Sequence, residues 1–383
     1  MYVPVFSQSD TTAFRSIGDD ASAVRPPSGL SSFFKTLSLK AKLFLLTTAA
    51  VALSVGVGVG LRRVASAAAP SVCDWADYRL PQNVVPTNYT IVWAPSLTVD
   101  CAAFQSGCAG GSCPFTGSST VDVVVQAASP CILVHSAGLR VDSASVANLR
   151  SGAARPASWR EDAANERLVV ANPVAAGVGD TLRLVFTFSA NLSQTNNGLY
   201  QSQYLDDGGA TVTMLATQFE ATAARKAFVC FDEPAFKANF SLVFDGVPKA
   251  HTVLGNMPVA TTTPRGDGAT TVAFAASPRM STYLLALVCG KLVSVSAEVP
   301  AANGPLPLTG WAVSRGNNAA QLVFAVEAAK AIIPFYEGLF GVPFPLPKMD
   351  MAAIPDFAAG AMVSARPDPR PRARPENAPR NTD

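Results

Sequence analysis

The side chains best suited to chemistry lie in one stretch, residues 217–240, which reads TQFEATAARKAFVCFDEPAFKANF. Carboxylates such as Glu220 bind an ammonium group well, because the cation needs opposite charge and hydrogen-bond acceptors. Taken alone, Glu220 is more typical of an ordinary surface residue on a strand. Asp232 and Glu233 resemble an acid–base pair, but Pro234 and the flanking phenylalanines favour a turn that holds a buried aromatic cluster. We therefore expect this pair to be structural.

Metal-assisted hydrolysis requires other residues. A common zinc site uses two histidines four positions apart on one helix face, a distant glutamate as third ligand, and a further glutamate that activates the metal-bound water. The chain has two histidines, His135 and His251, and neither has this spacing. Its seven cysteines include no CxxC pair. We therefore expect no catalytic residue and no metal ligand in this chain, and we interpret His135, in the apolar run ILVH, as a core histidine.

The cysteines indicate disulfides if the domain lies in an oxidising compartment. Cys101, Cys108, Cys113 and Cys131 surround a glycine-rich loop and allow three connectivities. Cys230 and Cys289 lie in apolar runs and are expected to be buried thiols. Cys73 is then left over, and could pair between two chains.

The periodicity of the chain changes once. Short alternating runs such as 120–125 and 181–188, separated by turns at 196–198 and 206–209, predict an antiparallel β-sandwich or saddle up to residue 297. Beyond residue 317 the pattern becomes helical, and Pro334 is expected to kink or end that helix. The apolar face of the helix is formed by Leu322, Val326, Ala329, Ile333, Tyr336 and Phe340.

The N-terminal region predicts a membrane anchor. Residues 43–61 form a 19-residue uncharged run, long enough to cross a bilayer, between basic pairs on both sides. A cleaved signal peptide is the alternative, because Ala65-Ser66-Ala67 is a suitable cleavage site. Three N-x-[ST] acceptors follow the run, at Asn88, Asn191 and Asn239. Together with the family resemblance described below, which implies a luminal ectodomain, they favour a single-pass type II membrane protein with an extracellular or luminal ectodomain.

Composition limits the partners. The net charge is +2 and charged residues make up 15% of the chain, so no polyanionic partner and no nucleic acid is indicated. Gly56 and Gly60 form a GxxxG pattern that could pack two helices into a homodimer, although chance is the better explanation in a segment this rich in small residues.

Four segments resemble, in order, the aminopeptidase N family of zinc metallopeptidases. They are 79–91, 217–240, 278–286 and 344–362, and the last contains Gly360-Ala361-Met362. The family continues Gly-Ala-Met with Glu-Asn, whereas this chain continues with Val363 and Ser364. The resemblance implies peptide substrates and a zinc cofactor, although the chain supplies no zinc ligands. It also implies substrate contacts from Gln218, Glu220, Gly360, Ala361 and Met362, with Val363 in place of the family's second amine-binding glutamate.

The resemblance implies a mainly β fold whose N-terminal domain is intact and whose thermolysin-like α+β catalytic domain is cut off at its start. The expected parts are a cytoplasmic disordered tail (1–42), a transmembrane helix (43–61), a stalk (62–76), a β-domain (77–297), the truncated start of the peptidase domain (298–362) and a disordered Pro/Arg-rich tail (363–383).

We interpret the chain as the N-terminal part of a membrane-anchored zinc aminopeptidase, inactive as it stands, which arose from an incomplete gene model or aberrant splicing. The alternative is a non-catalytic, membrane-tethered β-domain that binds peptides or a partner protein. A soluble adhesion-like sandwich fits only if the apolar run is a cleaved signal. On the truncation interpretation, Leu322, Val326, Ile333 and Phe340 would be left uncovered, and residues 300–383 would be poorly ordered or prone to association.

Overall fold

The computed structural model describes residues 2–3, 72–95, 113–152, 154–357 and 361–363. The described part is mainly β, as predicted, with a single α-helix among the described residues. The predicted membrane span 43–61 and most of the predicted tails lie outside these ranges.

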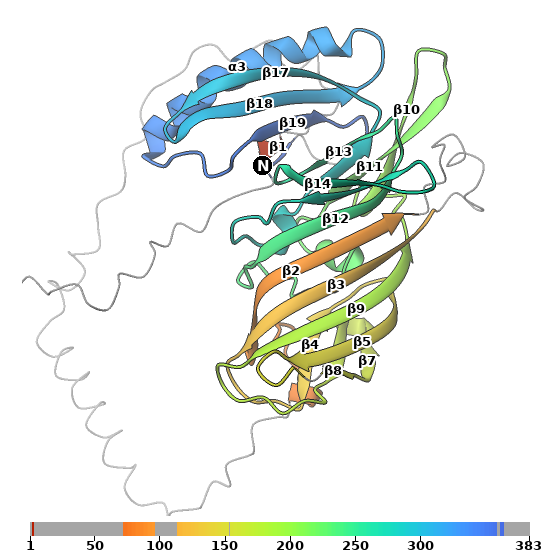
Figure 1. The fold of residues 1–383 in the computed structure, drawn as a ribbon, viewed down its shortest axis with the longest axis vertical. Helices are drawn as coiled ribbons and strands as arrows, with labels where there is room; N and C mark the ends of the chain where they lie inside the picture. The colour runs from red at the N-terminus through yellow and green to blue at the C-terminus, as the bar shows by residue number, and fades with distance from the viewer. Residues whose placement is uncertain (1, 4–71, 96–112, 153, 358–360, 364–383) are drawn as a thin grey trace, which may run out of the picture. The chain divides into compact units, whose positions relative to one another are not determined.

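The largest sheet has eight strands in the order β14-β15-β12-β2-β3-β9-β5-β6 (Figure 1). All neighbouring strands are antiparallel except β2 and β12, which run parallel. The predicted runs 120–125 and 181–188 lie in β3 and β9. The strands are β2 Val84–Pro95, β3 Pro114–Val125, β5 Arg140–Asn148, β6 Ala154–Pro156, β9 Thr181–Asn191, β12 Asn239–Val247, β14 Val259–Pro264 and β15 Thr270–Phe274.

Two smaller sheets complete the predicted β-domain. One has the order β4-β8-β7 and the other β10-β11-β16-β13. The predicted turn at 206–209 joins β10 to β11, and Asp206 Oδ1 accepts hydrogen bonds from the Gly208 and Ala210 amides. The strands are β4 Cys131–His135, β7 Trp159–Asp162, β8 Arg167–Ala171, β10 Gly198–Leu205, β11 Thr211–Gln218, β13 Thr252–Gly255 and β16 Leu287–Gly290. Short 3-10 turns occur at Val72–Asp74, Ala163–Asn165, Ala224–Lys226 and Thr282–Leu284.

The core of this domain lies between the large sheet and residues 219–231. Alternation along β2 buries Tyr89, Ile91 and Trp93. The Trp93 indole donates to the Ala227 carbonyl (2.9 Å), and the Phe231 amide donates to the Tyr89 hydroxyl (3.1 Å). The segment that carries the candidate residues is therefore fixed to the sheet by its backbone as well as by its aromatic side chains.

The C-terminal part combines one sheet with one helix. Strands β17 (Leu292–Ala301), β18 (Gly304–Val313) and β19 (Met349–Ala353) form the sheet, and helix α3 spans Asn318–Phe340. A Cβ at Gly310 of β18 would lie 2.9 Å from Val326 Cγ2, so glycine allows the helix to pack closely on the sheet. Gly341, with a φ of 63°, follows the last helical residue.

The alternative that Pro334 ends the helix is wrong, because Pro334 lies inside α3, while a kink at Pro334 stays a prediction. The expectation of an uncovered apolar face is also wrong. Leu322, Val326 and Ile333 are buried rather than uncovered, because the sheet β17-β18-β19 lies against that face. Phe340, beyond the sheet, is 68% exposed, as expected.

Residues 2–3 form a short strand, β1 (Tyr2–Val3), which pairs antiparallel with β20 (Met362–Val363). The prediction of a disordered tail over residues 1–42 did not include this strand. Tyr2 is opposite Val363, and Val3 is opposite Met362. These pairs place residues 2–3 beside the domain that contains β20.

Candidate functional site

Gln218 is the last residue of β11, and its side chain lies in an unusual environment. It pairs with Gly198 of β10, and alternation places it on the same face of β11 as Met214 and Ala216. Gln218 is only 9% exposed, and its carbonyl oxygen Oε1 has no hydrogen-bond partner among the described residues. Buried acceptors are nearly always paired, because leaving one unpaired costs free energy. The Gln218 carbonyl is therefore a buried acceptor without a hydrogen-bond partner among the described residues.

Glu220 lies just beyond the end of β11. Its side chain is exposed, whereas Phe219 before it is fully buried in the aromatic core. Its peptide bond to Ala221 is cis. The structure therefore places a carboxylate at the surface, two residues from the buried Gln218 acceptor.

The C-terminal segment reaches the same face of β11. The Tyr200 hydroxyl donates to the Asp356 carbonyl (3.2 Å), and the Asp356 amide donates to Ser202 Oγ (3.3 Å), so this segment is held against β10. Met362 is buried in one cluster with Met214 and Ala216. Ala361 is exposed, and Gly360 lies outside the described residues. Met362 and Gln218, 144 positions apart in the chain, are thus brought to one side of a single strand.

Asp232 belongs to a buried polar network. Its carboxylate accepts from Arg225 Nε (3.0 Å) and from the Thr282 hydroxyl (2.6 Å). Arg225 also contacts Glu166 (3.1 Å). Asp232 and Arg225 are both nearly inaccessible. The contacts of Asp232 hold the segment around it to Arg225 and Thr282 in the core, as expected for a structural residue.

Glu233 has a similar role. Its carboxylate accepts from the Leu80 amide (2.6 Å) and lies 3.7 Å from the Arg79 guanidinium. The neighbouring rings of Phe231 and Phe236 are in contact, with centroids 5.5 Å apart. The aromatic turn predicted around Pro234 is therefore present. Sequence reasoning missed the partners Arg225 and Thr282, although Arg225 and Asp232 flank one apolar run, 227–231.

His135 is a core histidine, as predicted. It is buried, and its Nδ1 accepts a hydrogen bond from the Asp232 amide (3.1 Å). Burial and the nearby Arg225 and Arg167 guanidinium groups lower the pKa of His135 to about 3. The ring is therefore neutral at physiological pH, in the state that can accept this hydrogen bond.

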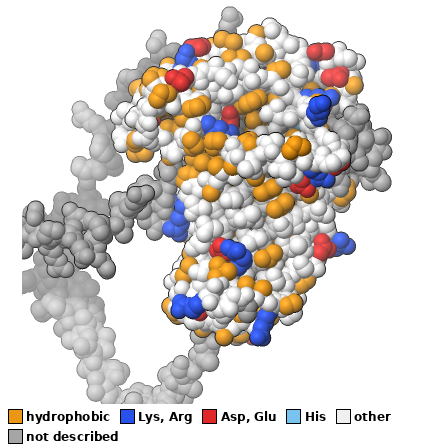
Figure 2. Space-filling model, in the orientation of Figure 1, with side chains coloured by type: hydrophobic (Ala, Val, Ile, Leu, Met, Phe, Trp, Pro, Cys, Tyr) orange, Lys and Arg blue, Asp and Glu red, His pale blue; other side chains and the backbone are white. Residues whose placement is uncertain are grey.

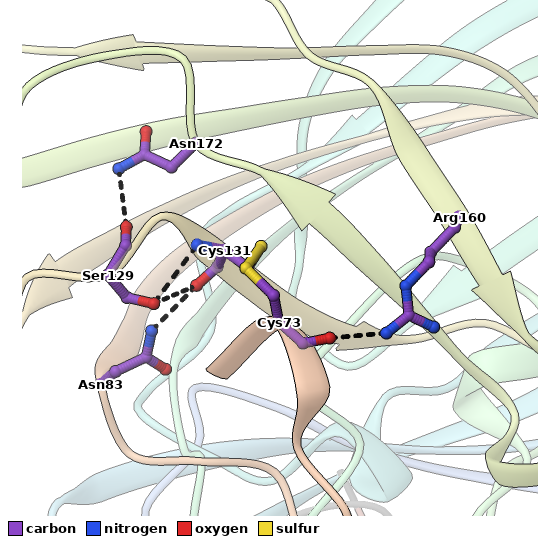
Figure 3. Close-up of a disulfide and its surroundings, with 6 residues drawn as sticks. All are labelled: Cys73, Asn83, Ser129, Cys131, Arg160 and Asn172. Atoms are coloured by element: carbon purple, nitrogen blue, oxygen red, sulfur yellow. Dashed lines mark hydrogen bonds between the residues drawn. A yellow bond between two sulfur atoms is a disulfide. The ribbon is translucent and has the colours of Figure 1, made fainter. Parts of the chain in front are cut away.

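The predicted grouping of the cysteines, with Cys131 in the glycine-rich cluster and Cys73 left over, was wrong. Cys73 is not left over: it forms a disulfide with Cys131, which had been assigned to the glycine-rich cluster (Figure 3). Cys113 is also disulfide-bonded. Cys230 and Cys289 are buried thiols, as predicted. The sequence could not reveal the Cys73 pairing, because it depends on how residues 72–80 pack on the fold.

Arginine side chains also hold residues 72–80, the segment that contains Cys73. Arg160 donates to the Cys73 carbonyl (2.5 Å), and Arg167 donates to the carbonyls of Trp75 (2.7 Å) and Asp77 (2.8 Å). Figure 3 shows the Arg160 side chain, which comes from β7, reaching the Cys73 carbonyl. Residues 72–80 are therefore fixed to β4, β7 and β8 by one covalent bond and several charged hydrogen bonds.

A zinc ion does not fit the residues present. No group of three His, Cys, Asp or Glu side chains that could hold a metal occurs within the described ranges. His135 uses Nδ1 for the Asp232 amide in the core, and the only other histidine of the chain is the half-buried His251. Since the sequence also lacks paired histidines, we derive no chemical step through zinc.

Figure 2 shows one face of the molecule, on which basic and acidic side chains are interspersed. This face has no continuous basic patch that would bind a polyanion.

Within the described part of the chain, α3 is long and apolar enough to cross a membrane. One side of it packs on β17 and β18, so we interpret it as a helix of the domain.

Comparison with known proteins decides the family. A model of the peptidase M1 N-terminal domain matches residues 85–284, and a model of the peptidase family M1 domain matches residues 324–365. Aminopeptidase N of Acetobacter pasteurianus is 37% identical over 285 residues, which cover 74% of this chain and 73% of that protein. The chain belongs to the peptidase M1 family.

Other M1 relatives are longer. Rat endoplasmic reticulum aminopeptidase 1 is 35% identical over 295 residues, which cover 75% of this chain but 29% of the relative. Puromycin-sensitive aminopeptidase of Caenorhabditis elegans is 33% identical over 285 residues, which cover 74% of this chain and 28% of the relative. The matched region thus spans less than a third of these two relatives. The M1 N-terminal domain accounts for the eight-stranded sheet and β11, and the M1 peptidase match begins inside α3.

Proposed function

We propose that this chain is the N-terminal, substrate-contacting part of an M1 zinc aminopeptidase, and that Gln218 and Glu220 contact the free amine end of a peptide. The observation that carries the proposal is the buried, unpartnered carbonyl of Gln218. It lies next to an exposed carboxylate and on the face of β11 that Met362 also reaches. A peptide ammonium group needs such acceptors and such a charge. Gly360 and Ala361 complete the proposed substrate-binding set.

We further propose that the 383-residue chain does not hydrolyse peptides by itself. Family membership implies zinc as the cofactor, which polarises the scissile carbonyl and activates water when bound. The chain has two histidines and no HExxH. The buried His135 ring already accepts the Asp232 amide.

The assay that tests this uses aminoacyl-aminomethylcoumarin substrates. We expect the purified chain to release no fluorophore above background, with or without added zinc, because no histidine pair positions the metal. The control is an intact M1 aminopeptidase under the same conditions. Release that a chelator abolishes would contradict the proposal.

The alternative is a non-catalytic domain that binds peptides or a partner protein. The same Gln218 observation favours it, since an acceptor for an amine can serve binding without hydrolysis. A silent chain that binds a peptide with a free N-terminus, but not its N-acetylated form, would favour the alternative. Loss of that binding in Glu220→Gln would assign it to this site.

We also propose that the chain is membrane-anchored through residues 43–61, with the β-domain luminal or extracellular. The relatives named endoplasmic reticulum aminopeptidase support a luminal domain. The pairing of β1 with β20 does not agree with this topology, because a single span at 43–61 puts residues 2–3 and Met362 on opposite sides of the membrane. Accessibility of an N-terminal epitope in sealed cells decides the orientation. A homodimer through Gly56 and Gly60 stays a prediction.

The three glycosylation acceptors are not equivalent in the fold. Asn191 is exposed at the end of β9, and Asn88 is exposed on β2. Asn239 is half-buried, lies opposite Asn88 in the register of β12, and donates through Nδ2 to the Ser277 carbonyl (2.7 Å). The Asn239 side chain is therefore less accessible than those of Asn88 and Asn191, and it is held against the Ser277 carbonyl.

We accordingly expect glycosidase treatment to lower the apparent mass of the protein made in a secretory pathway. Asn191→Gln should remove one glycan's worth of mass, and Asn239→Gln should remove none. Asn88→Gln tests the second exposed acceptor. The absence of any mass shift would contradict the luminal placement, and a shift lost only in Asn239→Gln would contradict the assignment of sites.

A further inference from the structure

Strand β14 (Val259–Pro264) is an exposed edge of the eight-stranded sheet. It begins the strand order, and among the described strands it pairs with β15 alone. All six of its residues are exposed, and even Val259 is 48% exposed. Because successive side chains of a strand point to opposite faces, this exposure means that neither face of β14 packs on the core. A large group can therefore be attached here without displacing a core residue.

The sequence of this strand is rich in hydroxyl groups. Thr261, Thr262 and Thr263 are consecutive, and prolines precede and follow them at positions 258 and 264. Proline fixes its own φ and holds the residue before it in an extended conformation. Threonine-rich segments that contain proline are typical of O-glycosylated chain. The strand thus presents three neighbouring hydroxyls on an extended, exposed backbone.

The three hydroxyls are also chemically available. Within the described ranges of the chain, no hydrogen bond engages the hydroxyl of Thr261, Thr262 or Thr263. Thr187 of β9 is exposed too, but it lies inside the sheet and its hydroxyl shares a hydrogen bond with that of Ser143 (2.7 Å). Exposure alone therefore does not make a threonine of this domain available, and β14 differs in having free hydroxyls at an edge.

The disulfide between Cys73 and Cys131 favours one kind of modification. Disulfides persist in oxidising compartments such as the secretory pathway and are rare in the cytosol. Glycosyl transfer to threonine fits such a compartment. Phosphorylation fits less well: the dipeptide Thr263-Pro264 would suit a proline-directed kinase, but this would use one hydroxyl of the three and would require a cytosolic domain.

We propose that Thr261, Thr262 and Thr263 are sites of O-linked glycosylation by an N-acetylhexosamine. A glycosyltransferase of the secretory pathway uses a nucleotide diphosphate sugar as donor. The bond between the threonine Oγ and the anomeric carbon forms, the bond from that carbon to the diphosphate breaks, and the diphosphate leaves with the electron pair while the hydroxyl proton is released. The attached sugars lie beside the open edge of β14 and obstruct the addition of another strand. The proposal rests on the luminal or extracellular placement proposed above, and not on the amine site at Gln218.

The first arm of the test asks whether the folded chain is an acceptor. The purified full chain is incubated with uridine diphosphate N-acetylgalactosamine and a polypeptide N-acetylgalactosaminyltransferase, and the tryptic peptide 250–265 is sequenced by electron-transfer mass spectrometry. We expect hexosamine on at least one of the three threonines. The triple variant Thr261→Val/Thr262→Val/Thr263→Val keeps the β-branched shape without the hydroxyls and should lose the modification. Thr187→Val, the matched control from β9, should retain it.

The second arm uses the full chain made in mammalian cells, where a mass shift with N-glycosidase reports entry into the secretory pathway. A chain with N-glycans is expected to carry hexosamine on peptide 250–265, and the triple variant is expected to lack it. N-glycans together with an unmodified peptide would overturn the proposal alone. A phosphate on Thr263 would overturn it in favour of a kinase site. If N-glycans are absent, the luminal placement fails, and the first arm decides: incorporation supports the acceptor site, and no incorporation overturns it as well.

Discussion

Replacing Asp232 with alanine is expected to lower the free energy of unfolding by about 3–5 kcal/mol, because it leaves the buried Arg225 guanidinium with only the exposed Glu166 carboxylate as counter-charge. Arg225 and Asp232 are 3% and 2% exposed, so water cannot take over the lost interaction. The variant also deprives the Thr282 hydroxyl of its acceptor. Urea unfolding followed by tryptophan fluorescence measures the effect, since Trp93 lies in the adjoining core.

The matched control is Asp142→Ala. Asp142 pairs with Arg140 at 3.1 Å, but both side chains are well exposed, at 41% and 79%. Exposed ion pairs contribute between about 0 and 1 kcal/mol, so this variant should unfold almost as the parent does. Equal losses in the two variants would show that the Asp232 network contributes no more than a surface pair.

Removal of the Cys73–Cys131 disulfide is the second large effect. The two cysteines are separated by 58 positions. Cross-linking a loop of this length restricts the unfolded chain, and the loop-entropy relation gives about 4 kcal/mol for it. The double variant Cys73→Ser/Cys131→Ser is expected to show a lower urea midpoint than the parent under non-reducing conditions, by an amount that corresponds to this loss.

A reductant provides the internal control for this measurement. It should destabilise the parent by more than it destabilises the double variant, in which only other disulfides, such as that of Cys113, remain to be reduced. A reductant effect of the same size in both proteins would mean that the Cys73–Cys131 bond does not stabilise the fold.

Local patterns predicted the strands well because burial on one face of a sheet imposes a period of two. The alternation at 181–188 became β9, with Leu182, Leu184, Phe186 and Phe188 buried. Patterns were less informative for α3, since both of its sides are apolar. The six-residue stripe identified the buried side correctly at Leu322, Val326, Ala329 and Ile333, but Tyr336 and Phe340 extend past the sheet and are exposed.

The candidate site could be predicted only through the family resemblance. Glu220 taken alone is an unremarkable surface residue, and nothing in the local sequence reveals that the Gln218 carbonyl is buried without a partner. The site also brings together distant parts of the chain, since Ile354, Phe357 and Met362 lie in one buried cluster with Tyr200 of β10 and Ala216 of β11. The Cys73 pairing and the partners of Asp232 escaped prediction for the same reason.

The fixed segment 72–80 has a mechanical consequence. In the proposed anchored protein, tension from the membrane side enters the domain at residue 72. The sulfur–sulfur bond passes that load directly from Cys73 to Cys131 at the start of β4, so residues 74–130 are bypassed. A pull therefore acts on the β4–β8 pairing and leaves β2, with its aromatic core residues, outside the path of the force.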